Sequence, residues 1–260
     1  MELWKAAVLG IVQGLTEFLP VSSSGHLLLF ERILGVDTGG ADLFLGVMLH
    51  AGTLAAVLCV YARRLLDMVR HARRQLLWLI FATIPAALVG VLLGDAIDRL
   101  FFGGEWLWAA FALTALLLFL TDRRMRRNFP PRPLTAGRAF AVGAAQALAV
   151  LPGLSRSGVT LAAGTFCGLS REEAADFSFL LSVPVIAGAL AVELLSALLA
   201  DGFVAAVSWQ SLAVGTFCAA VSGLLSVRGM LRCMRGARLW PFAVYLALLA
   251  LLLIVWQIFF

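Results

Sequence analysis

Charged residues are scarce in this sequence of 260 residues. Only 13% of the residues are Asp, Glu, Lys or Arg, whereas 62% are hydrophobic and the mean hydropathy is +0.98. A soluble globular domain carries about 25% charged residues, and its core cannot hold so much apolar side chain. The shortage of charge excludes a water-soluble enzyme and a disordered protein, and it indicates an integral membrane protein.

Several familiar sequence signatures are also absent. The four cysteines show no CxxC or Cys/His spacing, which argues against a zinc site and a disulfide framework. The sequence contains neither a GxxxxGK[ST] loop nor a Rossmann glycine pattern. The net charge of +5 comes mainly from arginines in three clusters between apolar stretches. Such clusters are typical of membrane topology, so we expect no nucleic-acid partner.

Six apolar stretches are long enough to cross a membrane as helices. They are residues 43–62, 75–94, 106–121, 177–200, 211–227 and 239–258. Fifteen of the twenty basic residues lie in three linkers, which are residues 63–74, 122–138 and 228–238. These linkers should lie in the cytoplasm, whereas linkers 95–105 and 201–210 should lie outside. This alternation predicts both termini outside.

Two further apolar regions, residues 3–34 and 139–170, are each interrupted by a polar stretch that contains glycine and proline. By the alternation of the spans, the first region must begin and end outside, and the second must begin and end in the cytoplasm. Each region is therefore predicted to form a re-entrant hairpin. Irregular backbone at membrane depth needs protein or water to satisfy its polar groups, so the hairpin tips should meet in a polar pocket.

The two interrupted regions resemble each other. QGLTEFLPVSSSG at 13–25 and QALAVLPGLSRSG at 146–158 share the order Gln, Leu-Pro, Ser and Gly, with equal spacing from Gln to Gly. Because three spans follow each hairpin, the copies should have opposite orientations. We predict a single all-α membrane domain over 1–260, with six transmembrane helices and two hairpins in an inverted-topology repeat (about 1–121 and 139–258). Chance similarity between small apolar residues is the alternative.

The first hairpin carries polar and ionisable groups whose burial at membrane depth costs free energy. Gln13 and Glu17 lie four residues apart and share a helix face. The break is followed by three hydroxyls and an imidazole, in Ser22, Ser23, Ser24 and His26. An ionisable residue in this environment is functional by default, and the set offers a base, candidate nucleophiles and a proton donor. Alternatively, the serines cap a following helix.

The second hairpin centres on Arg156, which is flanked by Ser155, Ser157 and Thr160. A buried arginine needs an anionic partner, and its planar fork suits phosphate. We therefore predict that Arg156 binds the substrate phosphate together with Ser155, Ser157, Thr160, Ser22 and Ser24. A buried ion pair between Arg156 and Glu17 is the alternative, and substrate could open such a pair. Together the hairpins suit a substrate with a phosphorylated head and a lipid tail, and so predict phosphoester chemistry.

His50 is also an ionisable residue, but it lies inside the first predicted span. We interpret it as a hydrogen-bonded core histidine rather than a ligand.

QGLTEFLPVSSSGHL and LPGLSRSGVT resemble the two signature motifs of the bacterial undecaprenyl-diphosphatase (bacitracin-resistance) family. IPAALVG at 84–90 and EEAADFSFLLSVP at 172–184 resemble further family segments, in the expected order. The resemblance covers essentially the whole chain. It implies a phosphatase of the bacterial inner membrane that removes the terminal phosphate of undecaprenyl diphosphate. This reaction recycles the lipid carrier for peptidoglycan synthesis and confers bacitracin resistance.

The resemblance also implies roles for individual residues. Glu17, Ser23, His26 and Arg156 match the catalytic positions, and Arg156 also matches the phosphate-binding arginine. The family's divalent metal, Mg²⁺ or Ca²⁺, would be held by Glu17. Gln13 stands where many members have Glu, so it is a weak ligand, and coordination would rest on Glu17 and the substrate's phosphates. The nucleophile is Ser23 or a water molecule in the same pocket.

The sequence leaves other functions open. Inverted repeats with broken helices and a charged midplane site are also the architecture of secondary carriers, so a prenyl-phosphate transporter or flippase is the main alternative. A membrane scaffold is a third alternative, but it leaves Glu17 and Arg156 without a role. The expected partner is a prenyl diphosphate lipid. The oligomeric state is left open, with a homodimer as one alternative.

Overall fold

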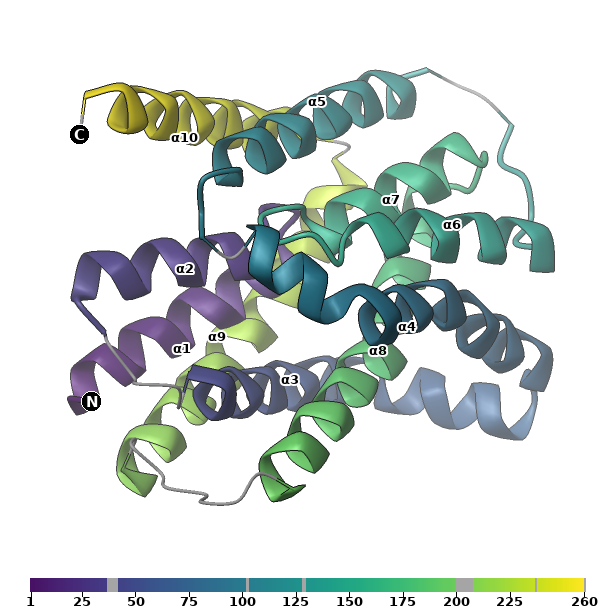
Figure 1. Ribbon diagram of the computed structural model, residues 1–260. Helices are drawn as coiled ribbons and strands as arrows, with labels where there is room; N and C mark the ends of the chain where they lie inside the picture. The colour runs from purple at the N-terminus through teal and green to yellow at the C-terminus, as the bar shows by residue number, and fades with distance from the viewer. Residues whose placement is uncertain (37–41, 102, 128–129, 200–207, 237, 260) are drawn as a thin grey trace.

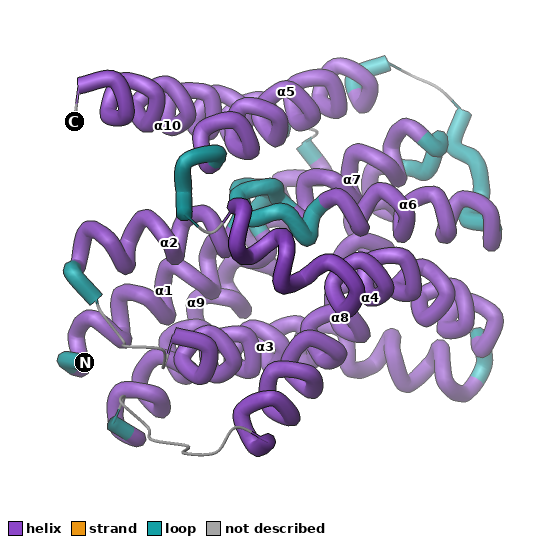
Figure 2. The backbone as a smooth tube through the Cα atoms, in the orientation of Figure 1, coloured by secondary structure: helices purple, strands orange, loops and turns teal. Residues whose placement is uncertain are grey.

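A computed structural model describes residues 1–36, 42–101, 103–127, 130–199, 208–236 and 238–259 (Figure 1). Helices account for nearly all of this part of the chain, and it contains no strand (Figure 2). The helices are α1 (Leu3–Phe18), α2 (Ser23–Leu34), α3 (Asp42–Arg70), α4 (Arg73–Phe101), α5 (Leu107–Met125), α6 (Ala136–Leu148), α7 (Arg156–Phe166), α8 (Arg171–Leu199), α9 (Trp209–Arg235) and α10 (Trp240–Phe259). The predicted all-α class is confirmed.

Within the described residues, five helices are long and apolar enough to cross a membrane. They contain Leu45–Arg70, Arg73–Gly94, Arg171–Val192, Trp209–Met234 and Trp240–Phe259. Large apolar side chains remain exposed along these helices, as Val91 and Leu92 on α4 and Leu251 and Trp256 on α10 illustrate. Such a surface requires lipid rather than water. The chain is therefore a multi-pass membrane protein.

The sixth predicted span, 106–121, corresponds to α5, which is a helix but is not one of the five. Its last turns contain Asp122, Arg123 and Arg124, which add charge to an otherwise apolar segment. Asp122 is nevertheless buried, because its Oδ1 accepts hydrogen bonds from the backbone N–H groups of Leu239 (2.8 Å) and Trp240 (3.2 Å). The acidic side chain thus caps the start of α10, beside which α5 lies (Figure 1).

Each interrupted region forms two helices separated by a short break. Residues 19–22 separate α1 from α2, and residues 149–155 separate α6 from α7. A serine ends each break and caps the next helix: Ser22 accepts from Gly25 N at 3.3 Å, and Ser155 accepts from Gly158 N at 3.1 Å. Both serines thus satisfy backbone donors that a helix start would otherwise leave unpaired.

The helix α1 is packed closely on α9 through small residues. A Cβ atom added at Gly14 would overlap the Ser222 hydroxyl and the Ala219 carbonyl oxygen. The close approach also lets the Ser226 hydroxyl donate to Leu15 O at 2.8 Å. Small residues and interhelical hydrogen bonds are the usual means of packing helices in a membrane. This contact fixes α1, which carries Glu17.

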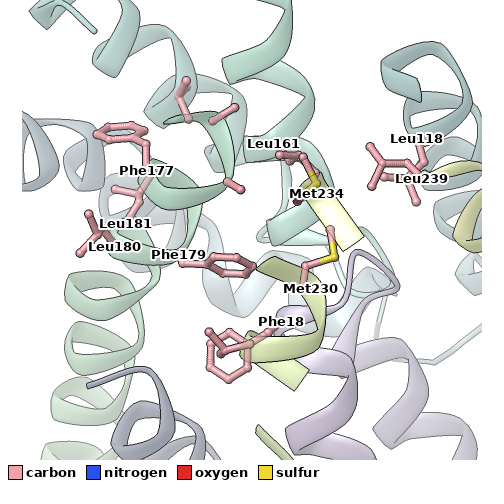
Figure 3. Packing of buried hydrophobic residues seen from close by; sticks show 14 of the residues in the cluster. Phe18, Leu118, Leu161, Phe177, Phe179, Leu180, Leu181, Met230, Met234 and Leu239 are labelled. Atoms are coloured by element: carbon pink, nitrogen blue, oxygen red, sulfur yellow. The ribbon is translucent and has the colours of Figure 1, made fainter. Parts of the chain in front are cut away.

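Buried apolar side chains lie directly behind the break after α1. Phe18 is fully buried and packs edge-on against Phe179 of α8, with the ring centroids 6.2 Å apart. Figure 3 shows Met230 of α9 and Leu161 of α7 in the same cluster. Phe18, the residue next to Glu17, thus belongs to a buried cluster to which α7, α8 and α9 also contribute.

Candidate active site

A cavity of about 280 Å³ lies where the two breaks approach each other. We call it the Glu17 cavity. Its polar lining residues are Thr16, Glu17, Ser22, Ser23, Ser24, His50, Gln146, Ser155, Arg156 and Ser157. Its apolar wall comes mainly from α4, α8 and the second break, and includes Ala86, Val150, Leu154, Val185 and Ile186. The cavity thus combines a polar side with an apolar side.

Glu17 is the centre of the polar side and is only 8% exposed. Its Oε1 accepts a hydrogen bond from Arg156 Nη2 at 2.6 Å. Its Oε2 accepts from Ser23 Oγ at 2.6 Å and from Gln13 Nε2 at 3.2 Å, and His50 Nε2 lies 4.0 Å away. A buried carboxylate with this many partners remains ionised only because the partners replace its lost hydration.

The first residues of two helices contact this carboxylate. Ser23 is the first residue of α2, and Arg156 is the first residue of α7. The partial positive charge and the unpaired N–H groups of a helix start favour an anion, and phosphate groups bind there in many proteins. The cavity therefore has the electrostatic character of a phosphate site, although Glu17 brings a negative charge to it.

Each break also contacts the start of the helix that follows the other break. Ser157 Oγ donates to Leu19 O at 3.0 Å, and the backbone N–H of Gly153 donates to Ser24 Oγ at 3.3 Å. Gly153 has a φ of +84°, a conformation that glycine adopts without the penalty of a side chain. Ser22, with a φ of +72°, adopts a left-handed conformation despite having one. Backbone strain of this kind is concentrated at functional sites.

The structure brings seven of the predicted site residues to the cavity: Glu17, Ser22, Ser23, Ser24, Ser155, Arg156 and Ser157. Three others lie elsewhere. Thr160 binds the Ser178 hydroxyl at 2.6 Å and so ties α7 to α8. Gln13 Nε2 donates to Glu17 Oε2, but Gln13 is not among the residues that line the cavity.

His26 is the third residue outside the cavity, and it is only 3% exposed. Its Nδ1 lies 2.7 Å from Ser22 O, and its Nε2 lies 2.7 Å from the Tyr245 hydroxyl. Both ring nitrogens are thus engaged within the protein. The catalytic role of His26, the phosphate contact of Thr160 and the metal contact of Gln13 stay predictions.

Three polar residues of the cavity were not predicted as site residues: Thr16, His50 and Gln146. His50 was interpreted as a core histidine, but it lines the cavity, and its Nδ1 is bonded to Gly46 O at 2.8 Å so that Nε2 faces Glu17. The signal that could have identified it is that it is the only charged or imidazole side chain in 43–62. Gln146 could have been identified because it repeats the position of Gln13.

The donor set tests whether a metal ion fits this site. Within the residues that the structure describes, no group of three or more His, Cys, Asp or Glu side chains is arranged to hold a metal. Glu17 is the only carboxylate among the lining residues. Mg²⁺ is commonly bound by one or two carboxylates together with substrate phosphates, rather than by a cage of protein ligands. The residues therefore fit a divalent ion that arrives with a phosphorylated substrate.

Comparison with known proteins places these features in a family. Residues 6–252 match the model of the family described as bacitracin resistance protein BacA. The chain belongs to the BacA family. Every residue that lines the Glu17 cavity lies within the matched range.

Curated relatives of this BacA family member match it over nearly their full length. The chain is 39% identical over 258 residues to the undecaprenyl-diphosphatase of Carboxydothermus hydrogenoformans, covering 99% of this chain and 98% of that protein. It is 37% identical to the undecaprenyl-diphosphatase of Halothermothrix orenii, with 98% of both chains covered. It is 40% identical to that of Trichlorobacter lovleyi, with 94% and 93% covered.

Proposed function

We propose that this protein is an undecaprenyl-diphosphatase, a membrane hydrolase that converts undecaprenyl diphosphate to undecaprenyl phosphate and inorganic phosphate. The observation that carries the proposal is the contact of Ser23 and Arg156 with the two oxygens of Glu17 at paired helix N-termini. The names of the relatives support the same substrate. This activity recycles the carrier lipid for peptidoglycan synthesis and confers resistance to bacitracin.

The geometry supports a direct role for Ser23 and Glu17. Because Ser23 Oγ already donates to Glu17 Oε2 at 2.6 Å, the carboxylate can take the hydroxyl proton as Oγ attacks the terminal phosphorus. The bond from that phosphorus to the bridging oxygen then breaks, and undecaprenyl phosphate leaves. Water then attacks the phosphorus of the phosphoserine and the bond from phosphorus to Ser23 Oγ breaks. Oγ takes back the proton held by Glu17, inorganic phosphate is released, and the proton that the attacking water loses passes to solvent.

Arg156 can serve the carboxylate and the substrate at the same time. Its Nη2 holds Glu17, and its Nη1 has no partner among the described residues. A guanidinium has five N–H donors in a fixed plane, so Nη1 can donate to a phosphate oxygen while Nη2 keeps Glu17 in position. Positive charge at this point stabilises the charge that develops on the phosphoryl oxygens during attack.

A divalent metal, Mg²⁺ or Ca²⁺, is part of the proposal. Glu17 and the phosphate oxygens of the substrate would hold it, with Gln13 a weak ligand at most. When bound, such an ion would neutralise phosphate charge and so assist nucleophilic attack. The apolar wall of the cavity, which includes Val150, Leu154 and Ile186, suits the first isoprene units of the lipid.

We further propose that the chain folds as an inverted repeat with six transmembrane helices, two re-entrant hairpins, and both termini outside the inner membrane. The helix contacts support this arrangement because exchanging 1–121 with 139–258 preserves the most extensive of them. The packing of α1 on α9 becomes that of α6 on α4, α3 on α9 becomes α8 on α4, and the pairs α3–α8 and α5–α10 map onto themselves. The start of α1 and the end of α10 also lie on the same side of the molecule (Figure 1).

The decisive experiment measures release of inorganic phosphate from undecaprenyl diphosphate by the purified protein in detergent, with and without divalent metal. Glu17→Ala and Arg156→Ala variants that remain folded should lose this release. If the wild type binds the lipid without releasing phosphate, the proposed phosphatase activity is wrong. Transport in proteoliposomes would then become the leading function, although the relatives described above bear the name of an enzyme.

A further inference from the structure

Gln146 is a buried polar side chain with no hydrogen-bonding partner among the residues that the structure describes. It lies near the end of α6, lines the Glu17 cavity and is only 1% exposed. Neither its Nε2 nor its Oε1 forms a hydrogen bond within the described part of the protein. Buried amides are nearly always paired, and an unpaired one costs stability. The absence of a protein partner in a cavity wall points to a ligand as the partner.

The sequence repeat explains why Gln146 lacks a partner. In the first copy, Gln13 donates to Glu17, which lies four residues later on the same helix face. In the second copy, the residue four positions after Gln146 is Val150, whose side chain cannot accept a hydrogen bond. The second copy thus retains the glutamine and replaces its acceptor with an apolar side chain.

A second unpaired donor lines the same cavity. Arg156 Nη1 is buried and has no partner within the described ranges, whereas Nη2 is bound to Glu17. Both donors belong to the second copy, and Arg156 begins α7, whose helix start favours an anion. The ligand must accept hydrogen bonds from an amide and from a guanidinium at a helix start, and an ionised phosphate group does this.

We propose that Gln146 is a substrate-binding residue whose Nε2 donates to a phosphate oxygen, beside Arg156 Nη1. The inference rests on the proposed function for the identity of the phosphorylated ligand. Oε1 can accept from a phosphate oxygen that carries a proton. Gln146 has no hydrogen bond to Ser23 or Glu17, so it binds the substrate and takes no part in proton transfer.

The Gln146→Met variant tests this role because it keeps the side-chain length and removes both polar atoms. We expect the KM for undecaprenyl diphosphate to rise roughly 10-fold or more, the loss expected for one hydrogen bond to a charged group, while kcat changes little. The ligand-free variant should unfold at the same or a higher temperature than the wild type, because it buries no unpaired amide. An ordinary structural glutamine would lower the unfolding temperature instead.

A binding measurement separates this inference from the proposed function. Inorganic pyrophosphate should raise the unfolding temperature of the wild type, and this rise should be smaller in Gln146→Met. Gln146→Glu, which places a negative charge beside the phosphate, should lose more of the rise and provides a second variant if the first does not fold. Gln210→Met makes the same chemical change at an exposed site at the start of α9 and should behave as wild type.

A Gln146→Met protein with the KM and the pyrophosphate response of the wild type would overturn the inference. Phosphate release by that same protein would leave the proposed function intact. Conversely, a wild type that gains stability from pyrophosphate through Gln146 but releases no phosphate would retain the binding site and refute hydrolysis.

Discussion

Ser23 and Arg156 occupy equivalent positions in the two sequence copies, each ten residues after a buried glutamine, and they bind opposite oxygens of one carboxylate. Each is the first residue of a helix that begins after a break. The same position of the motif is thus a hydroxyl in the first stretch and a guanidinium in the second. This pairing places the proposed nucleophile and the proposed phosphate-binding arginine on either side of Glu17.

The buried pair of Glu17 and Arg156 should respond to substitution as a unit. Removing one partner leaves the other charge buried without compensation, so Glu17→Gln or Arg156→Gln alone should destabilise the protein by about 3 kcal/mol. The double variant buries no unpaired charge and should recover part of that loss, while activity stays absent. Unfolding of the four proteins in one detergent measures the coupling. Additive losses would show that the 2.6 Å contact contributes nothing to stability.

Ser23→Ala should separate the two possible nucleophiles. If Ser23 attacks the phosphorus, the variant should lose roughly 10⁴-fold in kcat or more, and acid quenching of the wild type with substrate labelled in the terminal phosphate should leave label on the protein. If water attacks, the loss should be nearer 10²-fold, as for one positioned group. An unlabelled wild type together with the smaller loss would assign the attack to water.

His26 should act on the site through Ser22, because its Nδ1 bond to Ser22 O holds the residue that precedes Ser23. Tyr245→Phe removes only the hydroxyl at Nε2, so we expect about 1 kcal/mol less stability and activity within about threefold of the wild type. His26→Leu should lower kcat and the unfolding temperature together. If Tyr245→Phe abolished activity in a protein of unchanged stability, Nε2 would be part of a proton relay.

Much of the site could be predicted because it depends on short motifs whose residues lie close together in the sequence. The breaks at 19–22 and 149–155, their serine caps, and the meeting of Glu17, Ser23 and Arg156 follow from motif spacing and from charge at membrane depth. The orientation of the following helices could not be predicted. Helical spacing shows which side chains share a face, but packing against other helices decides which face borders the cavity.

His26, Thr160 and His50 illustrate that packing, rather than helical spacing, decides which side chains border the cavity. His26 turns toward Tyr245 and Thr160 toward Ser178, although both lie within one or two turns of a cavity residue. His50 faces Glu17, a contact across 33 residues that no local pattern specifies. The helix α5 extends beyond the predicted span 106–121 for another reason. Asp122 is stabilised by the start of α10, which is distant in sequence.

Gly14→Ala should disrupt the contact that positions Glu17. An added methyl group would overlap Ser222 and the carbonyl of Ala219, and overpacking of this kind costs about 1–3 kcal/mol. Gly90→Ala in α4 is the matched control, because no atom lies within 4 Å of an added Cβ atom there and alanine favours a helix by about 1 kcal/mol. We expect a lower unfolding temperature and reduced activity only in Gly14→Ala. Equal behaviour of the two variants would mean that α1 and α9 can separate without cost.

Metal dependence should require the substrate's phosphates. Glu17 is the only carboxylate among the residues that line its cavity, and it is already bound to Arg156, so the protein alone offers a divalent ion one shared ligand. Mg²⁺ or Ca²⁺ alone should therefore leave the unfolding temperature nearly unchanged, whereas either ion with pyrophosphate should raise it more than pyrophosphate alone. Chelation should stop phosphate release without unfolding the protein. A large stabilisation by metal in the absence of any phosphate would instead reveal a complete protein site, and Glu17→Gln would show whether that site includes Glu17.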